Sequence, residues 1–208
     1  MVVARNWFGY SSFYVDITLM AQYSENLNTV VVRVDANDME GWWYEGAGIY
    51  RHTWLVRRNS VHVITDGVNA NPVRDTNGAW FVPVEVTLEN SGRDQANAEV
   101  AVMLIGLNGM EVTQGKSCTV VTALARSVAK INIFVASPKF WSVADPPLYY
   151  ARATVSSGGK TNDEVMTTCG FRTIRFDADK GFFEGLASWL GRQRDGHRKR
   201  TVNYCDTK

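Results

Sequence analysis

The clearest pattern in the sequence is an alternation of hydrophobic and polar side chains with a period of two residues. Between residues 79 and 89, every second position is hydrophobic. This alternation is typical of a β-strand with one buried face. Pro83 lies on the opposite face and lacks a backbone N–H, which predicts an edge strand or a bulge. Helical periodicity is nearly absent before residue 182, so we predict an all-β protein.

Seven segments after residue 60 have strand-like patterns, and turn-forming pairs such as Asn77-Gly78, Asn108-Gly109 and Gln114-Gly115 separate them. Seven short strands in about 110 residues predict an immunoglobulin-like β-sandwich, which we place at 58–174. The segments are 61–65, 79–89, 98–107, 117–124, 128–136, 148–156 and 164–174. The expected core residues are Trp80, Val82, Val84, Val86, Val100, Val102, Leu104, Ile131, Ile133, Val135, Tyr149 and Phe171.

The segment before the sandwich contains three strand-like stretches, at 13–18, 29–35 and 49–58. Val30, Val31, Val32 and Val34 form a nearly continuous apolar run, the pattern of a strand buried on both faces. Three strands are too few to form a sheet that is covered on both sides. Residues 1–57 are therefore predicted to be an incomplete part of a larger β-domain.

The last segment, 175–208, loses the strand pattern. It carries a basic cluster at 192–200, and a short helix is conceivable at 182–191. A basic cluster could contact nucleic acid or an anionic membrane, but this one lacks interleaved aromatic residues. We therefore predict an irregular or short-helical, solvated tail.

Composition narrows the range of functions. The chain has 208 residues and a formal net charge of +1, which argues against nucleic acid as a partner. No apolar run approaches the roughly 18 residues of a membrane span, and no secretory signal is recognisable, so the expectation is no membrane partner and a cytoplasmic location by default. The three cysteines (Cys118, Cys169 and Cys205) are far apart, which predicts neither a disulfide framework nor a zinc site.

Several motifs of cofactor and metal chemistry are incomplete. Gly46 and Gly48 begin a phosphate-binding pattern, but Arg51 stands at its third glycine and a strand follows. The acidic stretch 177–181 lacks the glycine spacing and the final glutamate of a calcium loop. No pair of carboxylates is marked for acid/base chemistry. We predict no cofactor, no metal and no catalytic residue in this chain.

The densest aromatic cluster is Trp42-Trp43-Tyr44, which lies beside Asp38 and Glu40. Aromatic rings can stack on the C–H face of a sugar while carboxylates accept hydrogen bonds from its hydroxyl groups. These three residues are therefore the candidate substrate-binding site. The alternative is that the same rings pack this loop on a neighbouring domain.

Three stretches together resemble one family. They are GYSSFYVDIT at 9–18 with NTVVVRVD at 28–35, WYEGAGIYRHTWL at 43–55, and WSVADPPLY at 141–149 with GFRTI at 170–174. They are similar to motifs of glycoside hydrolase family 2, the family of β-galactosidases, β-mannosidases and β-glucuronidases, and resemble its β-galactosidase branch most. The resemblance implies that 1–57 is the end of a jelly-roll sugar-binding domain, that 58–174 is the immunoglobulin-like domain, and that 175–208 is a barrel lead-in followed by the tail.

The resemblance also implies what the chain should lack. In the family, a (β/α)₈ barrel follows this region and supplies both catalytic glutamates. Here Glu184 replaces the expected Leu-Asn-Gly continuation, and Trp42 stands where many members carry arginine. We therefore expect a truncated or frameshifted product that is inactive alone.

Three hypotheses remain open from the sequence. The first is a non-catalytic connector within a retaining O-glycosyl hydrolase of carbohydrate metabolism. The second is a free-standing carbohydrate-binding module that uses Trp42, Trp43 and Tyr44. The third is an immunoglobulin-like interaction module completed by another polypeptide or by a second copy of itself.

Overall fold

The computed structural model describes residues 2–9, 11–24, 26–36, 41, 46–179, 181–184 and 187–188. The chain divides into two units, Met1–Val56 and Arg57–Lys208. All regular structure among the described residues is β-structure, as the alternating sequence pattern predicts. None of these residues forms a helix that could cross a membrane.

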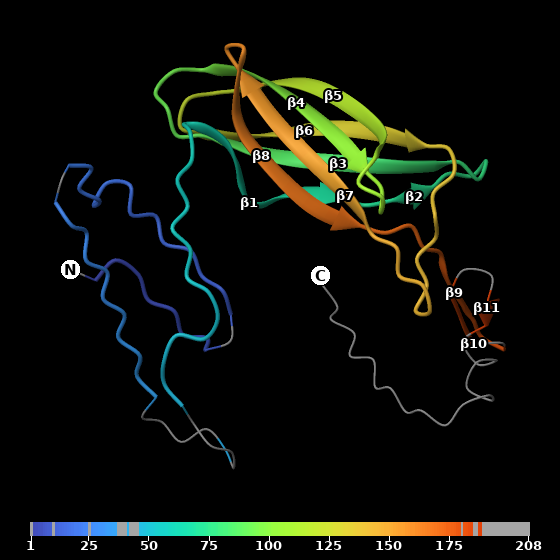
Figure 1. Ribbon diagram of the computed structural model, residues 1–208, viewed down its shortest axis with the longest axis horizontal. Helices are drawn as coiled ribbons and strands as arrows, with labels where there is room; N and C mark the ends of the chain where they lie inside the picture. Colours follow the sequence, from blue (N-terminus) through green and yellow to red (C-terminus); the bar gives the residue numbers. More distant parts are fainter. Residues whose placement is uncertain are drawn as a thin grey trace. The chain divides into compact units, whose positions relative to one another are not determined.

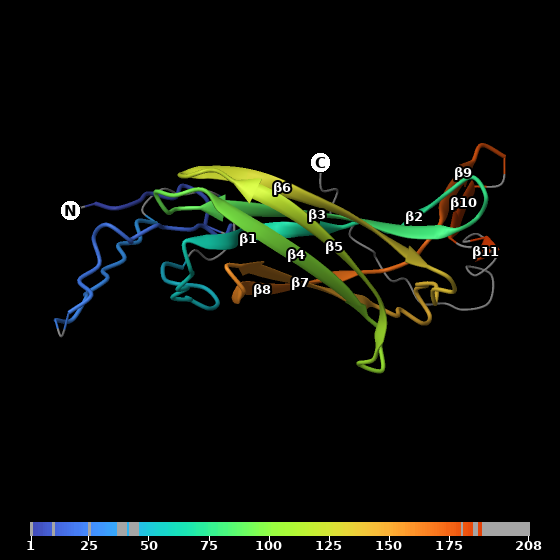
Figure 2. The same ribbon diagram turned by 90° about the horizontal axis from the view of Figure 1, so that it is seen from above.

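The second unit contains a sandwich of two antiparallel sheets (Figures 1 and 2). In the first sheet, β3 lies between β6 on one side and β1 and β2 on the other. The second sheet has the order β5-β4-β7-β8. The first sheet comprises β1 (Val61–Ala70), β2 (Val73–Arg74), β3 (Trp80–Asn90) and β6 (Ala125–Val135). The second comprises β4 (Ala96–Ile105), β5 (Glu111–Val121), β7 (Tyr149–Ser157) and β8 (Lys160–Cys169).

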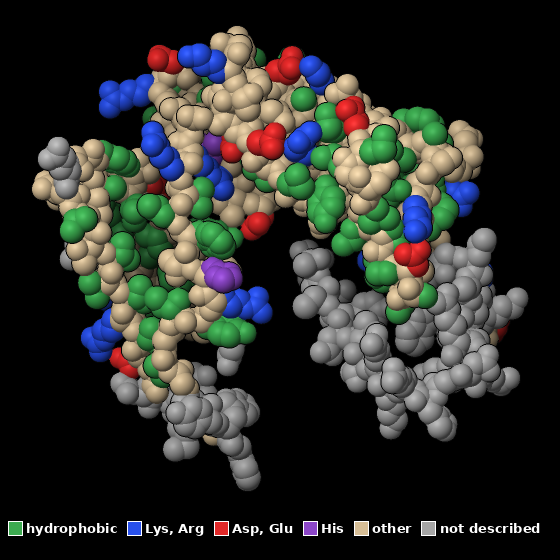
Figure 3. All heavy atoms as spheres, viewed as in Figure 1, with side chains coloured by type: hydrophobic (Ala, Val, Ile, Leu, Met, Phe, Trp, Pro, Cys, Tyr) green, Lys and Arg blue, Asp and Glu red, His purple; other side chains and the backbone are tan. Residues whose placement is uncertain are grey.

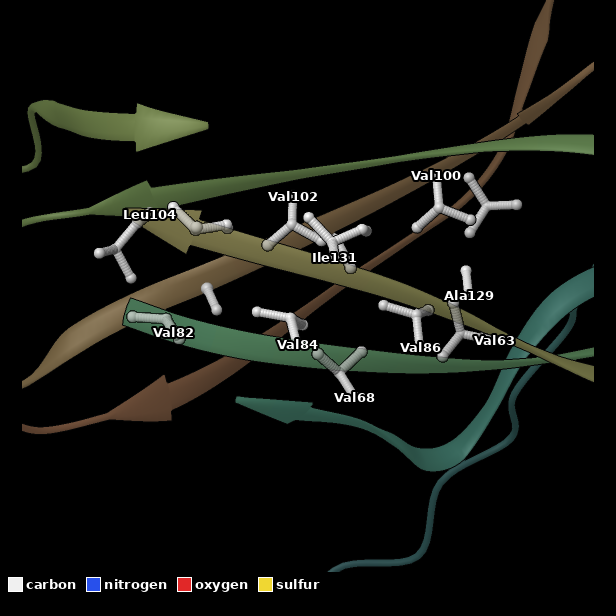
Figure 4. Close-up of a cluster of buried hydrophobic side chains, with 14 of the residues drawn as sticks. Val63, Val68, Val82, Val84, Val86, Val100, Val102, Leu104, Ala129 and Ile131 are labelled. Carbon is white, nitrogen blue, oxygen red and sulfur yellow. The ribbon is translucent and has the colours of Figure 1, made fainter. Parts of the chain in front are cut away.

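The core lies between these two sheets, and valine is its commonest residue (Figure 4). Val82, Val84 and Val86 of β3 are 0–1% exposed, and so are Val100 and Val102 of β4. All twelve residues predicted for the core are buried, so that prediction is confirmed. Burial of each such side chain contributes about 1.5–3 kcal/mol to stability, which makes this core the main source of the fold's stability.

The two edges of the sandwich are closed in different ways. On one edge, β5 turns into β6, and Gly115 lies against Ile131 and Ile133. On the other edge, the backbone N–H of Val63 in β1 donates a hydrogen bond to Asp163 Oδ2 of β8 at 2.9 Å. A carboxylate that accepts an unpaired N–H blocks the edge of the sheet against further strand pairing.

Two local sequence predictions are wrong. Gln114-Gly115 was expected to form a turn but lies inside β5, because a glycine is needed where the side chains of β6 approach closely. Pro83 lies neither on an edge strand, since β3 has neighbours on both sides, nor at a bulge, since the register with β6 runs through it without a shift. Its carbonyl accepts a hydrogen bond from Asn71 N, between the end of β1 and the start of β2. The ladder is interrupted there, so the missing N–H of proline costs little.

The irregularity of the first sheet lies in β1, where the register shifts between Val63 and Val68. Asp66 has a positive φ of 55° in this bulge. A Cβ atom on Gly67 would lie 2.7 Å from Ile64 Cγ1 and 2.8 Å from Ile64 O. The sharp bend at the bulge therefore requires glycine at position 67.

The first unit does not form the three predicted strands. The described residues of 13–18, 29–35 and 49–56 carry no strand assignment, and that expectation is corrected. Local contacts replace the strands. Met20 N and Ala21 N donate to Ile17 O in a turn, Asn28 Oδ1 accepts a hydrogen bond from Gln22 N at 2.7 Å, and Asn28 Nδ2 donates one to Gln22 O at 2.8 Å. A strand needs a ladder of backbone partners, and the described residues of these segments form no such ladder. The assignment of 1–57 to a jelly roll stays a prediction.

A third, small sheet follows the sandwich and has the order β11-β10-β9. Its strands are β9 (Ile174–Asp177), β10 (Gly181–Glu184) and β11 (Ala187–Ser188). The short helix that was conceivable at 182–191 is therefore wrong for every described residue in that range. The basic cluster at 192–200 lies outside the described residues.

Candidate functional site

The predicted sugar-binding residues Trp42, Trp43 and Tyr44 lie outside the described residues, as do Asp38 and Glu40. Their role stays a prediction.

The segment that follows them is described and contains further aromatic side chains. Tyr50 is 71% exposed and Trp54 is 77% exposed. The guanidinium of Arg51 lies 5.3 Å from the ring centroid of Tyr50, and the rings of His52 and Trp54 lie 5.5 Å apart. The rings of this segment were not predicted as candidate contacts, although the spacing of aromatic residues could have indicated them.

At one end of the sandwich, which we call the aromatic end, four rings converge: Trp80, Phe140, Tyr149 and Phe171. The ring centroid of Phe171 lies 5.5 Å from that of Trp80 and 5.0 Å from that of Tyr149, both in edge-to-face geometry. Phe140 packs on Trp80 at 5.5 Å. The backbone N–H of Lys139 donates a hydrogen bond to the Tyr149 hydroxyl at 2.8 Å. These contacts hold the connection between β6 and β7 against the core.

The same connection is fixed by polar contacts. Trp141 N donates to Phe171 O at 2.8 Å, and Arg172 lies over the Trp141 ring at 5.7 Å. Ser142 N donates to Asp145 O at 3.0 Å, and Lys139 Nζ pairs with Asp145 Oδ2 at 3.0 Å. Residues 141–149 and 170–174, two stretches of the family resemblance, thus meet in space. This contact was not predicted from the sequence.

The opposite end of the sandwich, which we call the polar end, is organised by Asn90. Its side chain is buried, with 1% exposed, and all its hydrogen-bonding groups are used. Nδ2 donates to Asp94 O at 2.8 Å and to Val121 O at 3.1 Å, while Oδ1 accepts from Gly92 N at 2.9 Å. Ser91 N donates to Ser60 O at 2.9 Å. The chain enters the sandwich at this end.

Several acidic side chains on the sandwich surface are paired with neighbouring cations across the strands. Glu85 Oε1 lies 3.0 Å from Lys130 Nζ, and Glu89 Oε2 lies 2.6 Å from Arg126 Nε. Both pairs lie on the solvent face of the first sheet. Within the described ranges, no group of three or more His, Cys, Asp or Glu residues could hold a metal ion.

Among the described residues, two groups have a perturbed pKa. The pKa of Asp16 is lowered because Thr18 donates hydrogen bonds to its carboxylate. Burial raises the pKa of the Cys169 thiol to about 11. Neither residue lies in a cluster of reactive groups, so the geometry of the described residues supports packing and positioning rather than acid/base chemistry.

Comparison with known proteins gives the family. Residues 61–172, which span the sandwich from β1 to the end of the aromatic cluster, match the family Glycosyl hydrolases family 2. The chain belongs to this family. The resemblance noted in the sequence is thereby confirmed.

Curated relatives of this family 2 chain are much longer than it is. The chain is 31% identical over 176 residues to Beta-galactosidase BoGH2A of Bacteroides ovatus, a match that covers 84% of this chain and 21% of that protein. It is 24% identical over 185 residues to a Beta-galactosidase of Thermoanaerobacter pseudethanolicus, covering 84% of this chain and 24% of that protein. The chain thus spans about a fifth of the length of these relatives.

Solved structures show the same sandwich fold. A glycosyl hydrolase family 2 member from Bacteroides cellulosilyticus superposes with a TM-score of 0.58 at 22% identity, covering 63% of this chain and 17% of that chain. A beta-glucuronidase from Bacteroides uniformis gives a TM-score of 0.57 at 19% identity, covering 61% and 16%. At these identities the likeness concerns the fold alone. The fold prediction, an all-β immunoglobulin-like sandwich, is confirmed.

Proposed function

We propose that this chain is the non-catalytic scaffold of a β-galactosidase-like family 2 glycoside hydrolase, an enzyme that hydrolyses O-glycosyl bonds in carbohydrates. The observation that carries the proposal is the form of the sandwich, which has a dry valine core and surface carboxylates held by cations such as Lys130 and Arg126. Retaining glycoside hydrolysis needs two carboxyl groups about 5–5.5 Å apart, one of them with a raised pKa. Such a pair would have to be supplied from outside the described residues.

A scaffold of this kind acts by fixing geometry. The chain enters the sandwich at the polar end and leaves it at the aromatic end, and both ends are fastened by hydrogen bonds and ring contacts. A rigid core between two anchored ends can hold the domains before and after it in a constant relation. Small errors in the position of catalytic groups lower the catalytic rate by large factors. A connector that fixes the positions of its neighbouring domains therefore supports catalysis without taking part in it.

The test of this proposal is an activity assay with the purified chain. We expect no release of nitrophenol from aryl β-galactosides or aryl β-glucuronides above the rate of a buffer blank. BoGH2A, assayed under the same conditions, is the positive control for the β-galactosides. Steady turnover by the chain alone would contradict the scaffold role.

A second candidate function is carbohydrate binding through Trp42, Trp43 and Tyr44. The observation that favours it is three consecutive aromatic residues beside Asp38 and Glu40. Titration with galactose or an oligosaccharide should then change tryptophan fluorescence. Trp42→Ala and Trp43→Ala should abolish the change, whereas Trp7→Ala, which removes an exposed tryptophan elsewhere, should retain it. An unchanged wild-type spectrum at saturating sugar would exclude this function.

The third candidate function is that of an interaction module, whose partner is a complementing polypeptide or a second copy of the chain. The supporting observation is the exposure of apolar side chains in Met1–Val56: Leu19 is 97% exposed and Val31 is 84% exposed. Exposed apolar surface of this kind marks interaction sites or causes aggregation. A clean monomer by size-exclusion chromatography with light scattering, unchanged when extracts of the native organism's proteins are added, would count against it.

A further inference from the structure

Exposed hydrophobic side chains are distributed unevenly between the two ends of the second unit. Among its described residues, all the exposed large hydrophobic side chains but Val120, Leu124 and Val128 lie in the half nearer Trp80 or in β9 beyond it. On the face seen in Figure 3, hydrophobic side chains gather on the side of the sandwich from which β9 leaves. Scattered single residues would need no explanation, but a one-sided concentration does.

The outer face of the first sheet shows the same division within a few strands. Val73, Phe81 and Phe134 lie directly opposite one another across β2, β3 and β6 and form a continuous apolar row. The rings of Phe81 and Phe134 are 5.5 Å apart, and Phe134 is 52% exposed. Farther along the same strands, this face carries the ion pairs Glu85–Lys130 and Glu89–Arg126. A sheet face that is solvated along its whole length is expected to carry polar side chains throughout, whereas this face is apolar in one half and charged in the other.

The apolar half also presents a preformed surface. Phe140 is 54% exposed although its ring packs on Trp80, and its segment is held by the Lys139–Asp145 pair and by Trp141 N. Side chains that are already ordered lose little entropy when a partner covers them. A partner that covers the aromatic end would therefore meet a low entropy cost.

The path of the chain indicates what covers it. After Phe171 the backbone leaves the sandwich at this end and enters β9, where Ile174 is 43% exposed and Phe176 is 81% exposed. The apolar surface therefore continues from the sandwich into the segment that leads away from it. In addition, the family 2 relatives are four to six times longer than the part that this chain matches.

We propose that the aromatic end, with the row Val73–Phe81–Phe134 and the exposed ring of Phe140, is a docking surface for a second folded domain of a family 2 polypeptide, held by apolar contact. This inference rests on the scaffold role proposed above and names the surface through which the scaffold acts. Domain interfaces within a chain bury about 600–1,500 Å², which a surface of several exposed aromatic and aliphatic side chains can supply. The polar end, whose groups are hydrogen-bonded among themselves, stays in solvent.

The test compares two positions on the same face of the same strand, Phe134 and Val128, which are 52% and 46% exposed. Phe134→Cys and Val128→Cys are each placed in the full chain with Cys118→Ser and Cys205→Ser, and the rate of maleimide labelling is measured. The same variants are then built into BoGH2A in which this chain replaces the 176 matched residues. We expect similar rates in the free chain, and in the chimera labelling about tenfold slower for Phe134→Cys only, because a dry interface excludes the reagent.

Equal rates for both positions in the chimera would overturn the proposal. Should the chimera not unfold cooperatively, the free chain is mixed with the part of BoGH2A that follows the matched residues, and lack of protection of Phe134→Cys there also overturns it. Protection that grows with the concentration of the free chain alone would assign the surface to a second copy and likewise refute the proposal. None of these readouts uses glycoside turnover, so failure of the docking surface is distinct from failure of the scaffold role.

Discussion

Two valine-rich stretches of this chain have similar sequences and opposite environments. Val82 and Val84 in β3 are 0% and 1% exposed, whereas Val30 and Val31 in the first unit are 75% and 84% exposed. β3 is hydrogen-bonded to β6 along its whole length and is covered by side chains of β4. The stretch at 29–35 carries no strand assignment and so has no such ladder. The comparison teaches that a hydrophobic strand sequence specifies a need for partners and does not supply them.

The largest test of this comparison is to place the same charge at both sites. Val84→Asp buries a carboxylate in a core that offers it no hydrogen-bond donor or cation, so we expect a loss of at least about 3 kcal/mol in the free energy of unfolding. Val31→Asp should change the unfolding of the sandwich by less than about 0.5 kcal/mol, because that side chain is exposed. Urea unfolding followed by circular dichroism measures both. Equal effects of the two variants would show that Val31 is buried in solution.

The second test concerns the edge of the sandwich at which Gly115 of β5 packs against Ile131 and Ile133 of β6. A Cβ atom on residue 115 would lie 2.7 Å from Ile131 Cγ2 and 3.2 Å from Ile133 Cγ1. Gly115→Ala should therefore destabilise the sandwich by about 1–3 kcal/mol through overpacking.

A matched double variant decides whether this contact is the cause. Gly115→Ala combined with Ile131→Ala removes Ile131 Cγ2, the atom nearest the new methyl group, and it should lose less stability than the sum of the two single variants. Strict additivity in a double-mutant cycle of urea midpoints would refute the close approach.

The third test uses the buried side chain of Asn90 at the end of β3. It shows whether a buried strand end also needs its polar groups to be hydrogen-bonded. Asn90→Ala leaves Val121 O, Asp94 O and Gly92 N without their present partner at the polar end. We expect a loss of about 1–3 kcal/mol. Asn132→Ala, at an exposed position on β6, is the control and should be nearly neutral. A neutral Asn90→Ala would mean that water replaces the side chain.

The sandwich could be predicted from the sequence because its signal is local. Alternation along β3 and β6 identifies the inward face of each strand without knowledge of the partner, and all twelve expected core residues are buried. The errors arose where the deciding contact is distant in sequence. Gly115 was read as part of a turn because nothing near it in sequence shows Ile131, and the stretch at 13–18 was read as a strand although no described residue pairs with it.

The candidate site was harder to predict for the same reason. The aromatic end joins Trp80, Phe140, Tyr149 and Phe171, which come from four separate parts of the chain. Trp80, Tyr149 and Phe171 were predicted only as core positions, like nine other residues. Nothing in the sequence indicates that their rings meet, and only the fold brings them together. Trp42, Trp43 and Tyr44 were noticed because they are consecutive, a property that says little about where their side chains lie.

The smallest effect is expected from the two described cysteines. Like the valines compared above, one is buried and the other is exposed. Cys118 is exposed, whereas Cys169 is buried and has its pKa raised from 9.0 to about 11. Between these values the unfolded chain releases the Cys169 proton while the folded chain keeps it, so stability falls as the pH rises from about 9 to 11. Cys169→Ala removes this contribution, and we expect its free energy of unfolding to fall with pH less steeply than that of the wild type, by about 1–2 kcal/mol over the interval. Cys118→Ala should keep the wild-type slope. Identical slopes for the wild type and Cys169→Ala would show that the thiol is accessible to water in the folded state, and would weaken the claim that the core is dry at the aromatic end.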